Sequence, residues 1–224
     1  MPTALITGAS RGIGRSIALR LASDYDIVAV ARSRGDLEAL AREIVGRGRR
    51  CTPIALDVAD DRAVQQALSA MDADVLVNNA GVGSLKPVLE LTPDEWRQMV
   101  SVNFDGVYYV TRAVLPGMVR RRRGHVVNIG SISGRSAYVG GACYAATKHA
   151  LMAFTECLML EVRDSGVKVS IVNPGSVATD FSTRADPSWM LSADDVAESV
   201  AHVLATPPNV LVHRLEVRAR SKRP

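Results

Sequence analysis

A serine, a tyrosine and a lysine stand at a spacing that could support acid–base chemistry on an alcohol or a carbonyl. Ser131 follows an apolar run, Tyr144 lies thirteen residues later in a segment with helical character, and Lys148 comes four residues after Tyr144. Residues four apart share one helix face, so we expect the ammonium beside the phenol. Tyr144 would be the general acid/base, Lys148 would lower its pKa, and Ser131 would orient the substrate oxygen.

The electrostatic effect of the lysine has the required size. A phenol has an ordinary pKa near 10, and lowering it by about three units takes about 4 kcal/mol. A unit charge at about 4 Å supplies an interaction of about that size near a protein surface. Taken singly, each of these residues is more often a packing, capping or solvated side chain. The catalytic interpretation depends on their joint occurrence at the carboxyl end of a parallel strand, where such sheets bind ligands.

A glycine-rich turn follows the first apolar run and opens the first helical segment. It reads Thr7-Gly8-Ala9-Ser10-Arg11-Gly12-Ile13-Gly14. Glycines let the backbone approach a pyrophosphate and let the helix lie close to the strand, while free N–H groups at the helix start face the phosphates. The spacing G-x-x-x-G-x-G differs from the commoner G-x-G-x-x-G. We expect a bound dinucleotide, in contact with Gly8, Ser10, Arg11, Gly12, Ile13 and Gly14.

The end of the second predicted strand indicates which dinucleotide is used. NAD enzymes of this fold usually carry an acid there for the ribose 2′-hydroxyl, but this strand ends Val30-Ala31-Arg32-Ser33. The first acid is Asp36, which the pattern Ser33-Arg34-Gly35-Asp36 assigns to a capping box. Arg32 and Ser33, with Arg11 opposite, suit a 2′-phosphate and predict NADP(H). The alternative is that both arginines are ordinary surface residues of an arginine-rich chain.

Apolar runs and helical stretches alternate along the whole chain. The runs predict strands at 4–7, 27–31, 52–56, 75–78, 125–129, 167–172 and 210–217. Helices are expected at 12–23, 36–46, 61–70, 93–118, 142–164 and 194–205. Near-continuous apolar strands alternating with helices are typical of a parallel sheet covered on both faces. We expect an α/β fold, a single doubly wound, Rossmann-like parallel sheet of about seven strands with helices on both faces, forming one catalytic domain over 1–224.

The composition excludes several classes of protein. The chain is 47% hydrophobic and 22% charged, with a formal net charge of +4 carried mostly by scattered arginines, which defines no nucleic-acid surface. No apolar run reaches the roughly 20 residues that cross a bilayer, and the start carries no leader pattern. Cys51, Cys143 and Cys157 form no even framework, which favours reduced thiols. We expect a cytoplasmic protein with no nucleic-acid partner, no membrane association and no metal site.

Further motifs complete a pattern that resembles the short-chain dehydrogenase/reductase family over essentially the whole chain. Besides TGASRGIG at 7–14, the resemblance rests on Asp57-Val58, on Asn78-Asn79-Ala80-Gly81 and on Pro174-Gly175-Ser176-Val177-Ala178-Thr179. It implies that Asp57 and Val58 contact the adenine. It also places at the cofactor Asn79, Ala80, Gly81, Tyr144, Lys148, Pro174, Gly175, Val177 and Thr179. Asn103 matches the catalytic asparagine of the family, which holds a water in a proton relay, and Ser131, Tyr144 and Lys148 match the other catalytic positions.

The resemblance implies direct hydride transfer between the nicotinamide and a small carbonyl or alcohol substrate. The short stretch between Thr179 and Ser192 resembles the compact subgroup of NADP-dependent 3-hydroxy acid and serine dehydrogenases. Candidate substrate contacts are Ser131, Val139, Cys143, Tyr144, Phe181 and Trp189. The alternative is a catalytically silent NADP(H) sensor, although such relatives usually lack the tyrosine or the lysine.

The helices at 93–118 and 142–164 carry more apolar residues than one sheet-facing stripe needs. In the family, these two helices pair across a two-fold axis. We therefore expect a homo-oligomer, either a dimer or a tetramer.

Overall fold

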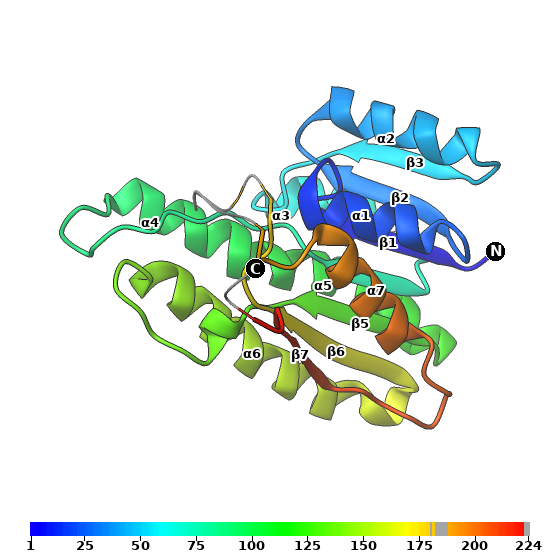
Figure 1. The fold of residues 1–224 in the computed structure, drawn as a ribbon. Coiled ribbons are helices and arrows are strands. Elements are labelled where there is room, and N and C mark those ends of the chain that lie inside the picture. Colours follow the sequence, from blue (N-terminus) through cyan, green and yellow to red (C-terminus); the bar gives the residue numbers. More distant parts are fainter. Residues whose placement is uncertain (180, 182–187, 222–224) are drawn as a thin grey trace.

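One parallel sheet organises the computed structural model, which describes residues 1–179, 181 and 188–221 (Figure 1). Its strands in these residues are β1 (Thr3–Thr7), β2 (Asp26–Ala31), β3 (Cys51–Ala55), β4 (Val75–Asn78), β5 (Gly124–Ile129), β6 (Val167–Pro174) and β7 (Arg214–Val217). They lie in the order β3-β2-β1-β4-β5-β6-β7, and all neighbours are parallel. The order reverses between β1 and β4, and ligands of such sheets bind at the carboxyl ends of the strands beside this switch point.

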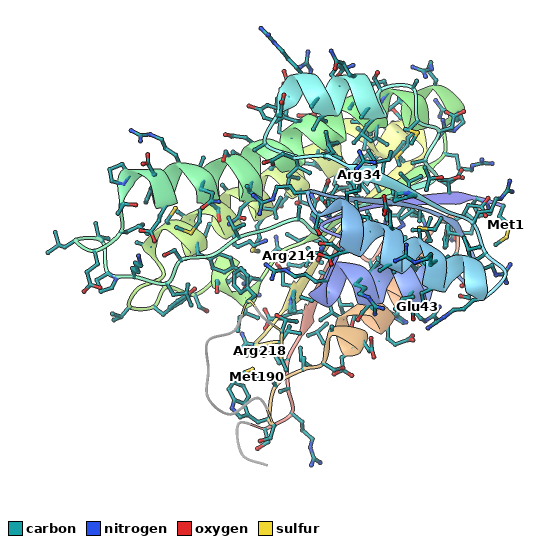
Figure 2. The ribbon with its side chains drawn as sticks, turned by 90° about the horizontal axis from the view of Figure 1, so that it is seen from above. Met1, Arg34, Glu43, Met190, Arg214 and Arg218 are labelled. Atoms are coloured by element: carbon teal, nitrogen blue, oxygen red, sulfur yellow. The ribbon has the colours of Figure 1, made fainter. Side chains whose placement is uncertain are left out.

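Helices cover both faces of the sheet, as Figure 2 shows from above. The described helices are α1 (Gly12–Leu21), α2 (Arg34–Gly46), α3 (Asp61–Leu68), α4 (Pro93–Val100), α5 (Gly106–Arg121), α6 (Ala142–Val162) and α7 (Ala193–Leu204). One apolar core joins the sheet to α1, α2 and α7, and a second joins the opposite face to α3, α5 and α6. The predicted doubly wound α/β sheet is confirmed.

The strand residues explain why two cores form. Along β1, Ala4 and Ile6 belong to the first core and Leu5 to the second, and all three are fully buried. Successive side chains of a strand point to opposite faces, so a strand covered on both sides needs apolar residues at every position. Near-continuous apolar runs in the sequence therefore correspond to the central strands.

Two element boundaries differ from the sequence prediction. The helix expected at 93–118 is divided by a π-helical turn, Ser101–Asp105, into α4 and α5, and α5 continues to Arg121. The strand expected at 210–217 is shorter, because only Arg214–Val217 pairs with β6. Val212 and His213 already make hydrogen bonds to Ser170, Ile171 and Val169 of β6, but the regular strand pairing begins only at Arg214.

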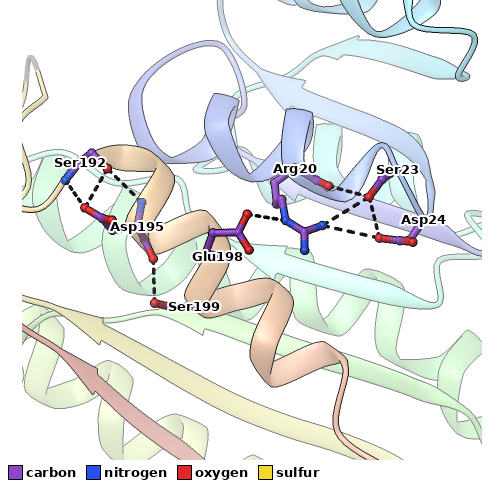
Figure 3. Close-up of polar contacts among 7 residues, drawn as sticks. All are labelled: Arg20, Ser23, Asp24, Ser192, Asp195, Glu198 and Ser199. Carbon is purple, nitrogen blue, oxygen red and sulfur yellow. Dashed lines mark hydrogen bonds and ion pairs between the residues drawn. The ribbon is translucent and has the colours of Figure 1, made fainter.

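Capping boxes fix the starts of α4 and α7. The Thr92 side chain accepts from the backbone N–H of Glu95, and the Glu95 carboxylate accepts from the backbone N–H of Thr92. Ser192 and Asp195 form the same pair at α7 (Figure 3). Each such cap contributes about 1 kcal/mol to helix stability. Helix α4 therefore begins at residue 93 as predicted, and α7 begins at Ala193, one residue before the predicted start.

Candidate active site

A pocket of about 710 Å³ lies at the carboxyl ends of the strands and contains the three candidate reactive side chains. Ser131 directly follows Gly130 at the end of β5, whereas Tyr144 and Lys148 lie four residues apart on α6. Lys148 is buried, and its Nζ lies 5.8 Å from the centre of the Tyr144 ring. The structure therefore brings together the serine, tyrosine and lysine that the spacing singled out.

Ser131 has a defined hydrogen-bond environment. Its Oγ accepts from the backbone N–H of Ser133 at 3.1 Å, and its own backbone N–H donates to Oδ1 of Asn173 at 3.2 Å. A serine hydroxyl has one proton to donate. With Oγ already accepting from Ser133, that proton can be directed towards the phenol of Tyr144, and this interaction lowers the pKa of Tyr144.

Burial controls the protonation of Tyr144 and Lys148 in the chain by itself. Desolvation raises the pKa of Tyr144 to about 12, opposed by the hydrogen bond from Ser131. Desolvation likewise lowers the pKa of Lys148 to about 8. We expected Lys148 to lower the pKa of Tyr144, but its Nζ donates to the carbonyl oxygen of Ile129 at 2.9 Å, and burial of the phenol prevails. The phenol is therefore protonated at neutral pH.

Asn103 lies in the π-helical turn and is fully buried. Its Oδ1 accepts from the backbone N–H of Val82 at 2.8 Å, and its Nδ2 donates to the carbonyl oxygen of Val82 at 2.9 Å and to Oγ1 of Thr147 at 3.3 Å. Asn103 is not among the residues that line the pocket. In the structure Asn103 holds the segment after β4 against α6. Its neighbour in the chain, Val102, lines the pocket.

The glycine turn forms the opposite end of the same pocket. Gly8 has a φ of +66°, and a Cβ there would lie 2.8 Å from Nδ2 of Asn79. A Cβ on Gly14 would overlap the carbonyl oxygen of Gly8. Of the turn residues expected at a cofactor, the pocket is lined by Gly8, Ser10, Arg11, Gly12 and Ile13. Gly14 is behind them, because its lack of a side chain serves the close packing of α1 on β1.

The end of β2 contributes Arg32, Ser33 and Asp36 to the pocket wall. Ser33 takes the N-cap position of α2, but its side chain makes no capping hydrogen bond. The capping box expected for Asp36 is therefore not formed, and its carboxylate shares the pocket rim with Arg32. The pattern Ser33-Arg34-Gly35-Asp36 predicted a helix cap at Asp36, and its place in the pocket wall is therefore a correction.

The remaining expected cofactor residues also line this pocket. They are Asp57, Val58, Asn79, Ala80, Gly81, Pro174, Gly175, Val177 and Thr179. They come from the ends of three different strands, β3, β4 and β6, so the parallel topology is what brings them together. Asn79 helps to hold this arrangement, since its Nδ2 donates to the carbonyl oxygen of Thr7 at 2.9 Å.

The expected substrate contacts divide into two groups. Phe181 lines the pocket, and its ring centre lies 5.5 Å from that of Tyr144. Val139, Cys143 and Trp189 lie outside the pocket lining. Val139 is 94% exposed in a turn, and Cys143 is 2% exposed with its Sγ 3.7 Å from the carbonyl oxygen of Trp96. One residue along a helix is a rotation of about 100°, so Cys143 faces α4 while Tyr144 faces the pocket.

Several lining residues were not predicted from the sequence. They are Val82, Leu85, Ile132, Ser133, Ser136, Tyr138 and Ser176. Most lie in the loops that follow β4 and β5, where no periodic pattern indicates which side chains turn inward. The one sequence signal for these residues was their position shortly after strands whose ends carry recognisable motifs.

Within the described part of the chain, no group of three or more His, Cys, Asp or Glu side chains could hold a metal ion. No described helix is both long enough and apolar enough to cross a membrane.

Comparison with known proteins assigns the family. The sequence model described as short chain dehydrogenase matches residues 2–188. The chain belongs to the short-chain dehydrogenase family. This short-chain dehydrogenase is 34% identical over 233 residues to the NADP-dependent 3-hydroxy acid dehydrogenase of Salmonella typhi, covering 95% of this chain and 93% of the relative.

Solved structures agree with this assignment. Serine dehydrogenase from Escherichia coli is 33% identical, with a TM-score of 0.87 over 96% of this chain and 97% of the other. An alcohol dehydrogenase from the archaeon Thermococcus sibiricus, complexed with 5-hydroxy-NADP, is also 33% identical, with a TM-score of 0.92 over 100% and 99% of the two chains. The predicted family, and the similarity to 3-hydroxy acid and serine dehydrogenases within it, are confirmed.

Proposed function

We propose that this short-chain dehydrogenase is an NADP(H)-dependent oxidoreductase that interconverts a carbonyl compound and the corresponding alcohol. The observation that carries the proposal is the meeting of Ser131, Tyr144 and Lys148 in one pocket that continues to the glycine turn. The dehydrogenases to which the chain is similar support both the reaction class and the cofactor.

The residues present fit a dinucleotide with a 2′-phosphate. The glycine turn lines the pocket with Gly8, Ser10 and Gly12, where the backbone can approach a pyrophosphate, and the missing side chain of Gly8 lets the turn pack against Asn79 and Ala80. Arg11 and Arg32 line the same end of the pocket, and guanidinium groups pair well with phosphate. When bound, NADP(H) supplies or accepts the hydride at the substrate carbon.

The chain's own residues manage the proton. In reduction, Ser131 donates a hydrogen bond to the carbonyl oxygen and Tyr144 transfers its phenolic proton to that oxygen. In oxidation, Tyr144 accepts the hydroxyl proton. The Lys148 cation lies close enough to favour the phenolate that each direction needs. Asn103 supports this relay by holding the backbone at Val82 and the side chain of Thr147.

The alternative, a catalytically silent NADP(H) sensor on the same fold, has less support. A sensor has no need for a buried lysine beside a tyrosine, and burying a charge is costly. Both side chains are present here and face one pocket. The deciding experiment follows NADPH oxidation at 340 nm with a panel of ketones, aldehydes and diketones. Turnover with none of them would favour the sensor.

We also propose that the chain forms a dimer or a tetramer through α5 and α6. Tyr108 on α5 is 47% exposed and Leu160 on α6 is 55% exposed, while Phe104 in the π-helical turn before α5 meets Phe154 on α6 edge to face. Exposed apolar side chains on adjacent helices are typical of an interface. Light scattering that shows a particle of 24.0 kDa would contradict this proposal.

We further propose that the protein is located in the cytoplasm. Its three cysteines are unpaired, and Cys51 and Cys143 are at least partly buried. Unpaired thiols are typical of a reducing compartment. Cell fractionation with detection of the native protein tests this location.

A further inference from the structure

The pocket continues beyond Ser131 and Tyr144 into a part lined by three loops. Leu85 comes from the loop after β4, Tyr138 from the loop after β5, and Phe181 from the segment after β6. Under the proposed function the reacting oxygen lies at Ser131 and Tyr144, so the rest of the substrate must occupy this part. Its chemistry therefore indicates which substrates fit.

Phe181 forms the wall beside the reacting oxygen. Its ring is tilted by 48° from that of Tyr144, with the centres 5.5 Å apart. On its other side the ring lies against Gly83, where a Cβ would overlap Cζ of Phe181. The absence of a side chain at Gly83 therefore allows an aromatic ring to lie next to the catalytic tyrosine. Phe181 is 45% exposed and retains apolar area that a ligand could cover.

Leu85 and Tyr138 form the rest of the mouth. They are 53% and 41% exposed. Their loops are in contact, because a Cβ on Gly140 would lie 3.5 Å from the carbonyl carbon of Leu85. Each half-exposed apolar side chain gains about 25 cal/mol for every Å² of apolar surface that a ligand removes from water. Phe181, Leu85 and Tyr138 thus offer a ligand apolar surface at the mouth.

Two cations of the described loops after β4 and β5 are already engaged. Lys86 pairs with Glu95 at 2.6 Å, Arg135 pairs with Glu216 at 3.7 Å, and neither lines the pocket. Among the described lining residues the cations are Arg11, Arg32 and Lys148.

Arg11 and Arg32 lie at the glycine turn and the end of β2, and Lys148 donates to Ile129. A substrate carboxylate would lose water at the mouth and meet hydroxyl groups such as those of Ser133 and Ser136, but no described cation, which is unfavourable for a charge.

We propose that the substrate is a neutral ketone or aldehyde with an apolar tail, whose tail lies between Phe181, Tyr138 and Leu85. This rests on the proposed function. In the reduction, the carbon–oxygen π bond breaks as the carbonyl carbon gains a hydride from NADPH and the oxygen gains the proton of Tyr144. The products are the alcohol and NADP⁺. By its preference for neutral substrates with an apolar tail, this chain would differ from an enzyme that selects small hydroxy acids.

A matched substrate series tests the proposal. Acetoacetate, its methyl ester and its hexyl ester carry the same ketone, and NADPH oxidation at 340 nm gives kcat/KM for each. We expect the methyl ester to exceed the acid by at least about tenfold, the cost of a poorly solvated charge. We expect the hexyl ester to exceed the methyl ester by at least about tenfold, since each buried methylene contributes up to about 0.8 kcal/mol.

Variants locate the effect at the mouth. In Leu85→Ser and in Phe181→Ala, the gain from methyl to hexyl ester should fall to about threefold or less, because less hydrocarbon is covered. Leu89→Ser is the matched control, since Leu89 is in the same loop, fully exposed and outside the pocket lining. It should leave the gain unchanged.

The outcomes are distinguishable. The proposal of a neutral, apolar substrate is overturned if acetoacetate has the same kcat/KM as its methyl ester, or if kcat/KM does not rise with tail length. Either result leaves the proposed oxidoreductase function unaffected. A gain that persists in both mouth variants also overturns the proposal. If neither these three compounds nor any member of the wider carbonyl panel supports NADPH oxidation, the proposed function itself is contradicted.

Discussion

The ammonium of Lys148 donates a hydrogen bond to the carbonyl oxygen of Ile129, 2.9 Å away, in the interior of the protein. Ile129 is the last residue of β5, two positions before Ser131. The bond therefore ties α6, which carries Tyr144, to the strand that positions the serine. Its cost is the burial of a charge, which lowers the pKa of Lys148 to about 8.

This cost predicts that Lys148→Met is more stable than the wild type at pH 7. The folded-state pKa of about 8 lies below the ordinary 10.5, so between these values the unfolded chain binds a proton that the folded chain does not. Stability therefore rises with pH across that window, and below it the buried charge costs at most about 3 kcal/mol, partly offset by the bond to Ile129.

Thermal unfolding by circular dichroism should show a higher midpoint for Lys148→Met at pH 7, with the gap narrowing towards pH 10.5. Turnover should be lost. Lys168→Met is the control for activity, because Lys168 donates to Pro207, far from the pocket. A lower midpoint at pH 7 would show that the hydrogen bond to Ile129 outweighs the cost of burial.

Tyr144→Phe should abolish turnover and leave cofactor affinity nearly unchanged. The phenol is needed for proton transfer, whereas the ring can still pack against Phe181. The measurements are kcat and the Kd for NADPH by fluorescence titration, with Tyr25→Phe as a distant control. Retention of more than about a tenth of wild-type turnover, worth only about 1.4 kcal/mol of barrier, would exclude Tyr144 as the acid/base.

The raised pKa of Tyr144, about 12 in the chain by itself, predicts opposite pH profiles for the two reaction directions. A protonated phenol is ready to act as the acid, so kcat for ketone reduction should be nearly constant between about pH 6 and 8. Alcohol oxidation needs the phenolate and should accelerate with rising pH. Rates in both directions, measured at constant ionic strength, test this contrast, and an oxidation rate that falls with rising pH would contradict it.

Arg32→Asp should reverse the choice of cofactor. We expect the wild type to prefer NADPH over NADH in kcat/KM by at least about 30-fold, or about 2 kcal/mol. An aspartate would repel the 2′-phosphate and accept from a ribose hydroxyl instead. Arg34→Asp makes the same charge change two residues away, outside the pocket lining, and should preserve the preference. A wild type that uses both cofactors equally would refute this role for Arg32.

Glu95→Gln should loosen the loop that carries Leu85. The Glu95 carboxylate accepts from Lys86 at 2.6 Å, from Ser84 at 3.1 Å and from the backbone of Thr92 at 3.0 Å. The bond to Lys86 is the main cause that lowers the pKa of Glu95 from 4.5 to about 2. The carboxylate therefore stabilises the fold above pH 4.5, and this contribution is lost as the pH falls towards 2.

The variant should accordingly unfold at a lower temperature than the wild type at pH 7, and the difference should vanish near pH 2. It should also raise the KM for an apolar ester more than it lowers kcat. Asp94→Asn is the matched control, because the ion pair described for the neighbouring Asp94 is with Arg97. If the two substitutions changed the unfolding midpoint and the KM equally, the prediction that Glu95 anchors the loop of Leu85 would be contradicted.

The sequence predicted the architecture because its signals are local and repeated. Apolar runs bounded by turn residues identified the strands, and the spacing of Tyr144 and Lys148 placed both on one helix face. The carboxyl ends of parallel strands meet at one edge, so the turn at Gly8 and the residues after β5 had to face a common pocket. These conclusions needed no knowledge of loop conformation.

The details that sequence analysis missed depend on three-dimensional packing. Cys143 is adjacent to Tyr144, yet it faces α4, because the rotation of α6 is set by what its other side packs against. The pKa of Tyr144 could not be inferred from its distance to Lys148, since desolvation is the larger effect. Tyr138 and Leu85 reach the pocket through loop conformations that no periodicity encodes.

The π-helical turn at Ser101–Asp105 makes part of this protein intolerant of changes in length. Each residue of an α-helix turns the chain by about 100°, so removing one residue between α4 and α5 would rotate the two helices relative to each other. Asn103 would then leave the backbone of Val82, and the wall after β4 would lose its attachment to Thr147 on α6. These hydrogen bonds therefore fix the combined length of α4, the turn and α5, whereas exposed loops generally tolerate insertions.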